Sequence, residues 1–381
     1  MRKLHFGNKK PGSGIGRLIL IIALVLIVVA CVSAAVIYIS SSKDKPITVS
    51  DAKSQAVELA LDSGTSYSHA VTENKTFFFS TDSVIISSNS GELEQNMTLK
   101  ASNPIISTDG KYALIADKGG KSAHLFLGSK LEKSILLEEN IIISKVNSNG
   151  YALFITEGDV HKHSAIVTSP TGEEIFKWQS GSLYVVSADI SNNNRDIALS
   201  TVNTDGGIVT SNVYMFNVTK DKPFTNEPIQ DEIFGVMRFE GSYLYCIGSD
   251  KTYIYNDYGK CISTIDYEGK ELLNYAMSGG TVALLYSDST KTANGSVVCS
   301  YTQKGDALGE FYLDSAARFI DLRDGVIAVD NNRVISILDS KCREKFQLST
   351  EMSLSDFLFL GGSSTAIGVT ATSAQIIQVR K

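Results

Sequence analysis

The sequence lacks the short motifs that mark the commonest enzyme and metal sites. It contains no Gly-x-Ser-x-Gly, His-Glu-x-x-His or Gly-x-x-x-x-Gly-Lys-Ser/Thr segment. These absences argue against an α/β-hydrolase, a zinc protease and a P-loop nucleotide-binding protein. No Cys-x-x-Cys pair is present either, so a zinc or thiol redox site of that type is not indicated. We therefore predict no catalytic, cofactor-binding or metal-binding residue from motifs, and no cofactor.

Charge and hydropathy are distributed unevenly along the chain. Residues 1–17 contain five Lys or Arg and no Asp or Glu, a local charge of +5. Because the formal net charge of the whole chain is −6, the remaining residues carry −11, and this acidic part is a poor match for nucleic acid. Residues 18–39 contain no charged side chain, and a helix of that length spans roughly 33 Å, about one hydrocarbon core. By the positive-inside rule we predict a cytoplasmic tail (1–17), a transmembrane helix (18–39) and an extracytoplasmic remainder, and hence a single-pass protein of the cell membrane.

The apolar segment also permits two processing alternatives. "VVAC", which ends at Cys31, resembles a lipoprotein cleavage box, and "VSA" before Ala35 resembles a signal-peptidase site. Both cuts would fall inside the apolar run, which is longer than a typical signal h-region of roughly 7–15 residues. We therefore favour a retained helix and leave cleavage, or lipidation at Cys31, as alternatives.

A turn followed by an apolar run recurs eight times after residue 62, at intervals of roughly 36 to 46 residues, close to those of propeller blades. Each copy is flanked by further short runs rich in Val, Ile, Tyr and Phe and bounded by Gly, Asn, Asp or Ser, as strands are. The copies read "ENKTFFFS", "DGKYALIA", "SNGYALFI", "NNRDIALS", "EGSYLYCI", "GGTVALLY", "RDGVIAVD" and "SSTAIGVT".

Seven of the eight units contain four predicted strands, and the eighth ends after three. The hairpin "SPTGEEIFKW" (Ser169–Trp178) supplies the outer strands of the third unit. The missing outer strand of the last unit is expected from residues 47–61, although "SDAKSQAVELAL" also permits a stalk helix. We predict an all-β, eight-bladed β-propeller over 63–381, preceded by a linker or closing strand (40–62). Seven blades are the first alternative, and an open solenoid or a sandwich the next.

The outer hairpins, with glycine in the turn and an aromatic residue on the returning strand, resemble quinoprotein-type (PQQ-repeat) propeller blades. The Trp-Asp dipeptide of WD40 blades is absent, which counts against that subtype. The anchor-plus-propeller layout resembles an uncharacterised family of single-pass membrane proteins of Gram-positive bacteria. Quinoprotein dehydrogenases carry a calcium-bound quinone, often beside a disulfide of adjacent cysteines. This chain has no adjacent cysteines and one Trp, so the resemblance implies no cofactor site here.

Two segments contain side chains suited to metal binding or acid–base chemistry. His161 and His163 lie two residues apart, so on a strand both would face one side and could hold a metal, but no third ligand is evident. We interpret them as ordinary surface histidines. Asp321 and Asp324 suggest a carboxylate pair, with Asp321 directed toward the central channel from an inner strand. Because Asp324 precedes Gly325, we favour a turn residue and a structural interpretation of the pair.

The cysteines after the apolar segment are Cys246, Cys261, Cys299 and Cys342. The strand pattern places Cys246 on the second strand of the fifth unit and Cys261 at the start of its fourth strand. Cys342 is expected in the same position as Cys261, two units further on. Such separations exceed the roughly 7 Å that a disulfide can bridge, so we expect four buried or half-buried free thiols.

We predict a non-enzymatic binding or scaffolding module at the cell envelope, held by its own membrane anchor and contacting a protein or cell-envelope partner. The long insertions of the fourth and sixth units are the expected recognition loops. The alternative is an extracytoplasmic enzyme, such as a hydrolase, lyase or quinone-dependent oxidoreductase, with its site on the propeller axis. A cavity lined by three or more converging charged groups would favour that alternative. The inner strands supply few: His69, Lys145, Asp189, Arg238, Asp321 and Asp356.

Overall fold

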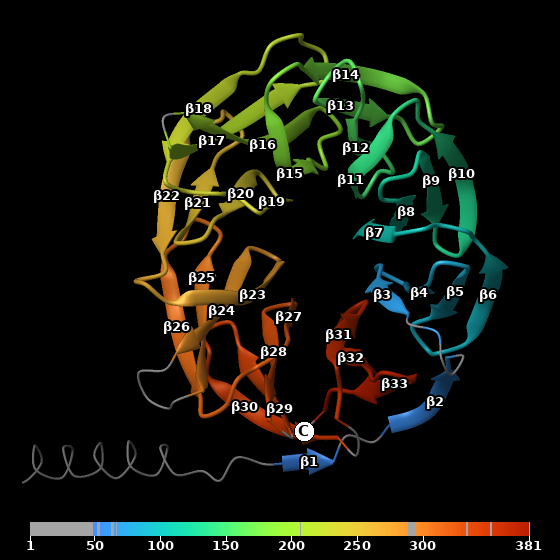
Figure 1. The fold of residues 1–381 in the computed structure, drawn as a ribbon. Helices are drawn as coiled ribbons and strands as arrows, with labels where there is room; N and C mark the ends of the chain where they lie inside the picture. The colour runs from blue at the N-terminus through green and yellow to red at the C-terminus, as the bar shows by residue number, and fades with distance from the viewer. Residues whose placement is uncertain are drawn as a thin grey trace, which may run out of the picture. The chain divides into compact units, whose positions relative to one another are not determined.

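The computed structural model describes residues 49–51, 54–61, 65, 67–205, 207–288, 294–332, 334–350 and 353–380. The predicted tail (1–17), the predicted helix (18–39) and Cys31 lie outside these residues. Within them, eight β-sheets are arranged as the blades of a ring, and the first strand of each blade is the innermost (Figure 1). The predicted eight-bladed propeller is therefore confirmed, and seven blades are excluded. No helix in the described part is long and apolar enough to cross a bilayer.

The first four blades follow one another along the chain. Blade 1 contains β3 (Ser68–Val71), β4 (Lys75–Phe79), β5 (Ser83–Ser88) and β6 (Leu93–Thr98). Blade 2 contains β7 (Pro104–Asp109), β8 (Tyr112–Asp117), β9 (Ser122–Leu127) and β10 (Lys130–Leu136). Blade 3 contains β11 (Asn140–Val146), β12 (Ala152–Glu157), β13 (His163–Thr168) and β14 (Glu174–Ser180). Blade 4 contains β15 (Tyr184–Ile190), β16 (Asp196–Asp205), β17 (Ile208–Asn217) and β18 (Thr225–Gln230).

The other four blades repeat this order, with changes only at the end. Blade 5 contains β19 (Val236–Glu240), β20 (Tyr243–Ile247), β21 (Lys251–Tyr255) and β22 (Cys261–Asp266). Blade 6 contains β23 (Glu271–Ser278), β24 (Thr281–Asp288), β25 (Gly295–Thr302) and β26 (Ala307–Leu313). Blade 7 contains β27 (Ile320–Arg323), β28 (Val326–Asn331), β29 (Val334–Asp339) and β30 (Glu344–Ser349). Blade 8 contains β31 (Asp356–Leu360), β32 (Gly362–Val369) and β33 (Ser373–Gln378) from the end of the chain.

Two N-terminal strands complete the last two blades. β2 (Ser54–Ala60) pairs antiparallel with β33 and becomes the outer strand of blade 8, as the sequence analysis expects for residues 47–61. β1 (Val49–Asp51) pairs in parallel with β30 and gives blade 7 a fifth strand. Both ends of the described chain are therefore tied into neighbouring blades.

The hydrophobic core is divided among the contacts between blades. The described residues form eight buried clusters, and each lies between two adjacent blades. In β4, Phe77 packs toward blade 2, where its ring meets Phe126 edge to face at 5.7 Å, whereas Phe78 packs toward blade 8. Both faces of a middle strand are therefore buried, and no blade can shield its own apolar surface without its neighbours.

The outer hairpins share one tight turn. In blade 3 the amide of Gly172 donates to the carbonyl of Ser169 (2.9 Å), and Gly172 has a φ of 82°, which favours glycine. Blades 1, 5 and 6 repeat this turn with a glycine in the same position. In blade 7 the position is taken by Cys342, with a φ of 57°. Cys342 therefore corresponds to a turn glycine and not to Cys261, which begins β22, so that part of the sequence prediction is wrong.

Candidate functional site

The six ionisable residues predicted for the inner strands all lie on the innermost strands, but most of them join neighbouring blades. The Asp189 carboxylate on β15 accepts a hydrogen bond from the Phe239 amide of blade 5 (2.7 Å). Asp321 on β27 does the same with the Phe359 amide of blade 8 (2.6 Å). Asp356 on β31 lies 2.9 Å from the His69 ring of blade 1. These residues hold the ring around its axis.

The pair Asp321 and Asp324 is divided between two structural roles. Besides the Phe359 amide, the Asp321 carboxylate accepts the amide of Leu322 (2.8 Å). Burial raises the pKa of Asp321 against the lowering effect of these backbone donors. Asp324 has a φ of 51° in the β27–β28 turn and accepts the Ser363 amide (3.1 Å).

The prediction that both histidines lie on the surface is wrong for His163. His163 begins β13 and is only 6 % exposed, and its Nδ1 accepts a hydrogen bond from the Val185 amide of blade 4 (2.7 Å). Burial lowers its pKa. Because β13 is sandwiched between blades, alternation along the strand does not bring this side chain to solvent. His161 is half-buried in the preceding turn, and the described residues contain no group of three or more metal-ligating side chains that could hold an ion.

The four thiols after the apolar segment are free. Cys246 and Cys342 are buried, and Cys261 and Cys299 are half-buried, as predicted. Burial raises the pKa of Cys299 and of Cys342 to about 11. Such thiols remain protonated at neutral pH and are poor nucleophiles.

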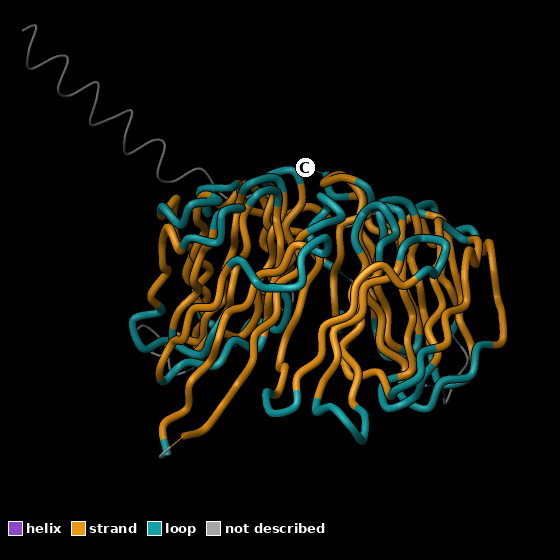
Figure 2. The backbone as a smooth tube through the Cα atoms, turned by 90° about the horizontal axis from the view of Figure 1, so that it is seen from above, coloured by secondary structure: helices purple, strands orange, loops and turns teal. Residues whose placement is uncertain are grey.

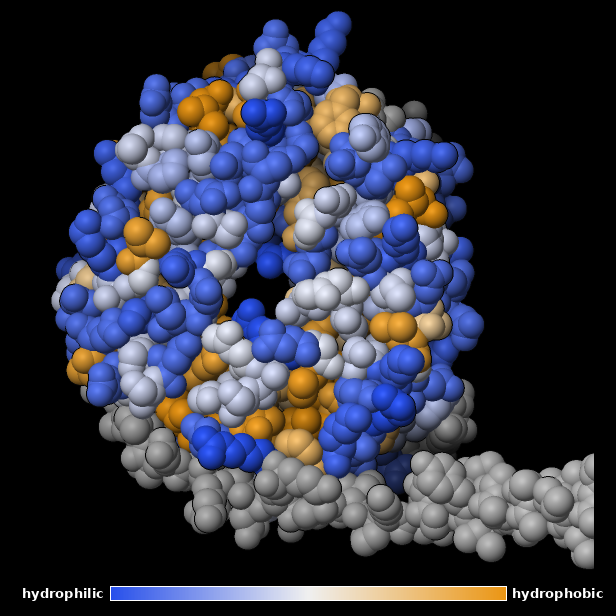
Figure 3. Space-filling view, turned by 180° about the vertical axis from the view of Figure 1, so that it is seen from behind, coloured by the Kyte–Doolittle hydropathy of each residue, from blue (hydrophilic) through white to orange (hydrophobic). Residues whose placement is uncertain are grey.

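A cavity of about 620 Å³ lies where the inner strands end near the axis. It is lined by residues from the turns between the first and second strands of several blades, and we call this side of the ring the cavity face. Figure 3 shows a hollow at the centre of the ring with strongly hydrophilic side chains at its opening. Two arginines line the cavity, Arg238 of β19 and Arg323 of β27. Its carboxylates are Glu73, Asp109, Glu240, Asp321 and Asp324.

The side chains of several charged residues of this cavity make no direct polar contact. Within the described ranges, the side chains of Asp109, Glu240, Arg238 and Arg323 make no hydrogen bond and no ion pair, and the Nε atom of Arg323 is buried. Burial alone would lower the pKa of Arg238, but the charges of Asp189, Asp109 and Glu240 outweigh it and raise that pKa. Unpaired charged groups in a partly buried site cost free energy, so they mark a place where a ligand can compensate them.

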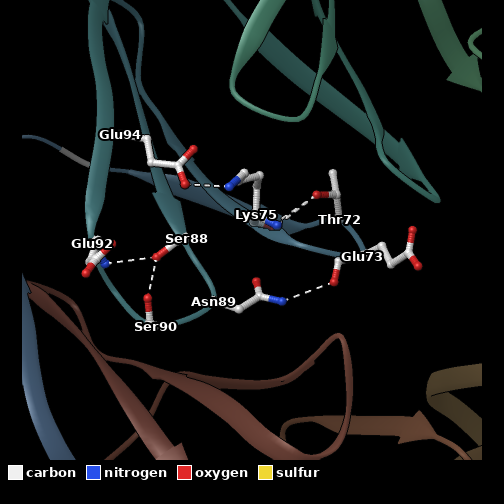
Figure 4. Close-up of polar contacts among 8 residues, drawn as sticks. All are labelled: Thr72, Glu73, Lys75, Ser88, Asn89, Ser90, Glu92 and Glu94. Atoms are coloured by element: carbon white, nitrogen blue, oxygen red, sulfur yellow. Dashed lines mark hydrogen bonds and ion pairs between the residues drawn. The ribbon is translucent and has the colours of Figure 1, made fainter.

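Glu73 shows how a turn places a free carboxylate at this cavity. The Asn89 amide donates to the Glu73 carbonyl (3.0 Å), and Thr72 is hydrogen-bonded to Lys75 within the same turn. Lys75 is in turn occupied by Glu94. In Figure 4 the Glu73 carboxylate extends away from all of these contacts. The backbone of the turn is fixed while the acid remains available.

The inner-strand positions of Arg238 and Asp321 were predicted from the sequence. The other charged residues of the lining were not predicted as cavity residues: Glu73, Asp109, Glu240 and Arg323. These four end an inner strand or follow it in the turn, and that position is the signal that could have found them. The cavity meets the criterion of three or more converging charges that favours an enzyme. Among the described residues that line it, none is a histidine or a cysteine.

The opposite side of the ring, which we call the hairpin face, carries the turns between second and third strands and the connections between blades. Its longest feature is the β16–β17 hairpin. The pairing of β15 with β16 begins at Tyr184 and Val202. The pairing of β16 with β17 continues further along the strands, to Asp205 and Ile208. The hairpin thus extends beyond its own blade (Figure 2).

Large apolar side chains are exposed on the hairpin face across blades 2 to 6. Val160 in the β12–β13 turn is 83 % exposed, and Ile208 begins β17 at the hairpin tip. The others lie at strand ends or in connections between blades: Leu136, Tyr184, Ile233 and Leu273. Lys162 lies over the Tyr184 ring at 5.5 Å, which brings the Val160 turn close to blade 4.

Comparison with known proteins identifies the family and supports the fold. The model of a family of unknown function, DUF5711, matches residues 48–379. No curated protein matches the sequence significantly. The structure is similar to BamB from Moraxella catarrhalis (14% identity, TM-score 0.55, covering 85% of this chain and 96% of that one). It is also similar to Saccharomyces cerevisiae Sqt1 (12%, 0.58, 88% and 100%) and to apo AztD from Citrobacter koseri (13%, 0.52, 81% and 90%).

Proposed function

The chain belongs to the DUF5711 family, whose model spans the whole propeller, and we propose that this propeller is a binding module that docks a protein partner on its hairpin face. The observation that carries this proposal is the set of exposed apolar side chains around the projecting β16–β17 hairpin. Val160, Ile208 and Ile233 come from three separate segments of blades 3 and 4 and the connection to blade 5. A rigid ring that presents apolar side chains from several loops is suited to recognising another protein.

The charges around these side chains specify the chemistry of the partner. Among the described residues, Glu157, Asp159, Asp231 and Asp250 are exposed in the neighbouring turns and connection. The basic residues of the same segments are Lys162 and Lys251, of which Lys251 is paired with Asp266. Such a surface is complementary to a protein segment that carries both basic and apolar side chains. It repels anionic lipid headgroups, and a second copy of the same face would set acid against acid.

We place this module outside the cytoplasmic membrane, held by a helix over residues 18–39. The five cations before that segment and its uncharged length support this arrangement. A membrane-impermeant amine reagent should label exposed lysines such as Lys130 in intact cells, because its side chain is 75% exposed. Labelling that appears only after lysis would overturn the placement.

Site-specific crosslinking in membranes from cells that express the full-length protein tests the hairpin face. A photoreactive residue at Val160 or Ile208 should capture a protein through a peptide rich in Lys or Arg and apolar residues, identified by mass spectrometry. The double charge reversal Asp159→Lys/Asp231→Lys should reduce the adduct at least tenfold, and so should high salt. The matched control is a photoreactive residue at Tyr258, 82% exposed on the cavity face.

Three results would contradict this function. They are an adduct to lipid, an adduct to a second copy of the chain, and an adduct that forms equally well at Tyr258 or in the charge-reversed variant. Asp257→Lys, which reverses an exposed charge on the cavity face, should leave the adduct unchanged.

An extracytoplasmic enzyme with its site on the axis is the second candidate, favoured by the converging charges of the cavity. It predicts turnover that depends on Arg238 and Glu240.

A further inference from the structure

We propose that the axial cavity binds a zwitterionic ligand of the amino-acid or short-peptide class, with its carboxylate at Arg323 and its ammonium group between Asp109 and Glu240. The cavity opens on the face opposite the one proposed for the protein partner, so the two sites do not overlap. Its volume of about 620 Å³ lies within the range of pockets that enclose small organic ligands.

The arginine of blade 7 supplies the anion-binding side. Arg323 is the last residue of β27, and its Nε–H is buried without a hydrogen-bond acceptor. The nearest acid along its strand, Asp321, already accepts two backbone amides, at 2.6 and 2.8 Å. Asp324 is occupied by the Ser363 amide. The planar guanidinium therefore has donors to offer, and its geometry matches a carboxylate.

The carboxylates of blades 2 and 5 supply the cation-binding side. Asp109 ends β7 and Glu240 ends β19, and both are half-buried with no hydrogen-bond or ion-pair partner in the described chain. Both line the cavity together with Arg238, and their charges attract its guanidinium. Glu73 adds a third, exposed carboxylate from blade 1.

The combination of both signs selects the ligand class. A simple anion would be attracted by Arg323 but repelled by the carboxylates, which outnumber the arginines of the lining five to two. A simple cation would match that excess but would leave the buried donor of Arg323 unpaired. A molecule with separated ammonium and carboxylate groups satisfies both sides and brings no net charge into the site.

The test uses the full-length protein in detergent, with triglycine as the probe and calorimetry or NMR titration as the readout. Triglycine has no side chains, so its only charged groups are its two ends. We expect saturable binding that is weakened at least tenfold by N-acetylation and at least tenfold by C-terminal amidation. Arg323→Gln and Asp109→Asn should each weaken triglycine binding at least tenfold. Arg195→Gln, which removes an exposed arginine of the same face outside the cavity, should leave it unchanged.

Spermidine separates the zwitterion site from a plain cation site. Loss of a positive charge tightens the binding of a cation, so a cation site predicts tighter spermidine binding in Arg323→Gln and no response to peptide amidation. That outcome overturns the proposal, as does the absence of saturable triglycine binding in a protein whose circular dichroism and melting are normal. None of these results depends on a partner at the hairpin face, so each proposal can fail without the other.

Discussion

Asp189 offers the sharpest test of how the ring is held together. Its side chain is 3% exposed, and its carboxylate accepts the Phe239 amide of the next blade at 2.7 Å. Asp189→Ala removes this acceptor and leaves the amide unsatisfied, which should lower the free energy of unfolding by about 1–3 kcal/mol. Asp189→Asn keeps an oxygen at the same position and should cost less than about 1 kcal/mol at pH 7. Urea unfolding followed by the fluorescence of Trp178 measures both.

The pH dependence separates the hydrogen bond from the charge. Burial raises the pKa of Asp189, although Arg238, Lys145 and the Phe239 amide oppose that shift. A raised folded-state pKa means that the folded protein binds the proton more tightly than the unfolded chain does. The stability from this group is complete below the unfolded pKa of about 3.9 and is lost as pH rises through the folded value.

Wild type should therefore gain stability relative to Asp189→Asn when the pH falls from 7 toward 4. An asparagine variant that is as unstable as the alanine variant at pH 7 would contradict the stabilising role of the Phe239–Asp189 hydrogen bond. A wild type that gains relative stability as the pH rises would contradict the raised pKa of Asp189, because attraction to Arg238 and Lys145 would then outweigh burial.

Two further predictions concern blade packing and the thiols. Gly309→Ala should lower the free energy of unfolding, measured in urea, by about 1–3 kcal/mol, because the added Cβ would collide with the Lys341 carbonyl of blade 7. Gly181→Ala, with open space around the position, should change it by no more than about 0.5 kcal/mol. Equal effects of the two substitutions would contradict the packing. Cys246 and Cys342 should react with a thiol reagent at pH 8 about a hundredfold more slowly in the native protein than in urea, because burial raises both thiol pKa values, that of Cys342 to about 11. Labelling at similar rates, located by mass spectrometry, would contradict the burial.

The strand order and blade number were predictable because the repeat is local. Each unit supplies turn residues and β-branched or aromatic runs at a regular interval. The segment Ser169–Trp178 forms the turn that follows β13 and most of β14, so it lies in the outer hairpin of blade 3 as predicted. The closing strand was predictable for a related reason, since a unit with three strands leaves an unpaired edge that residues 47–61 can fill. The parallel pairing of β1 with β30 was not, because three residues carry too little pattern to specify a distant partner.

The candidate sites were harder to predict, for physical reasons that individual residues illustrate. His163 lies on a strand buried on both faces, so alternation gives no sign of its environment. Arg323 and Asp109 are far apart in the chain, and they line one cavity only because the blades close into a ring around a common axis. Val160 lies in a turn and Ile208 begins β17, and both look like core residues in the sequence until the strand ends are known.

The pairing of β2 with β33 also determines when the ring can close. Register partners such as Ser54 and Ile377 are far apart in the chain, so β2, which is synthesised before the strands of blades 1 to 7 that follow it, must wait for β33 before blade 8 is complete. The earlier blades can stack on their neighbours while the chain is still being synthesised, but the contact between blades 8 and 1 cannot form until β33 has left the ribosome. A nascent chain therefore passes through an open ring in which the apolar faces of the first and last blades are exposed to solvent. This is the stage at which a chaperone would cover the largest apolar surface.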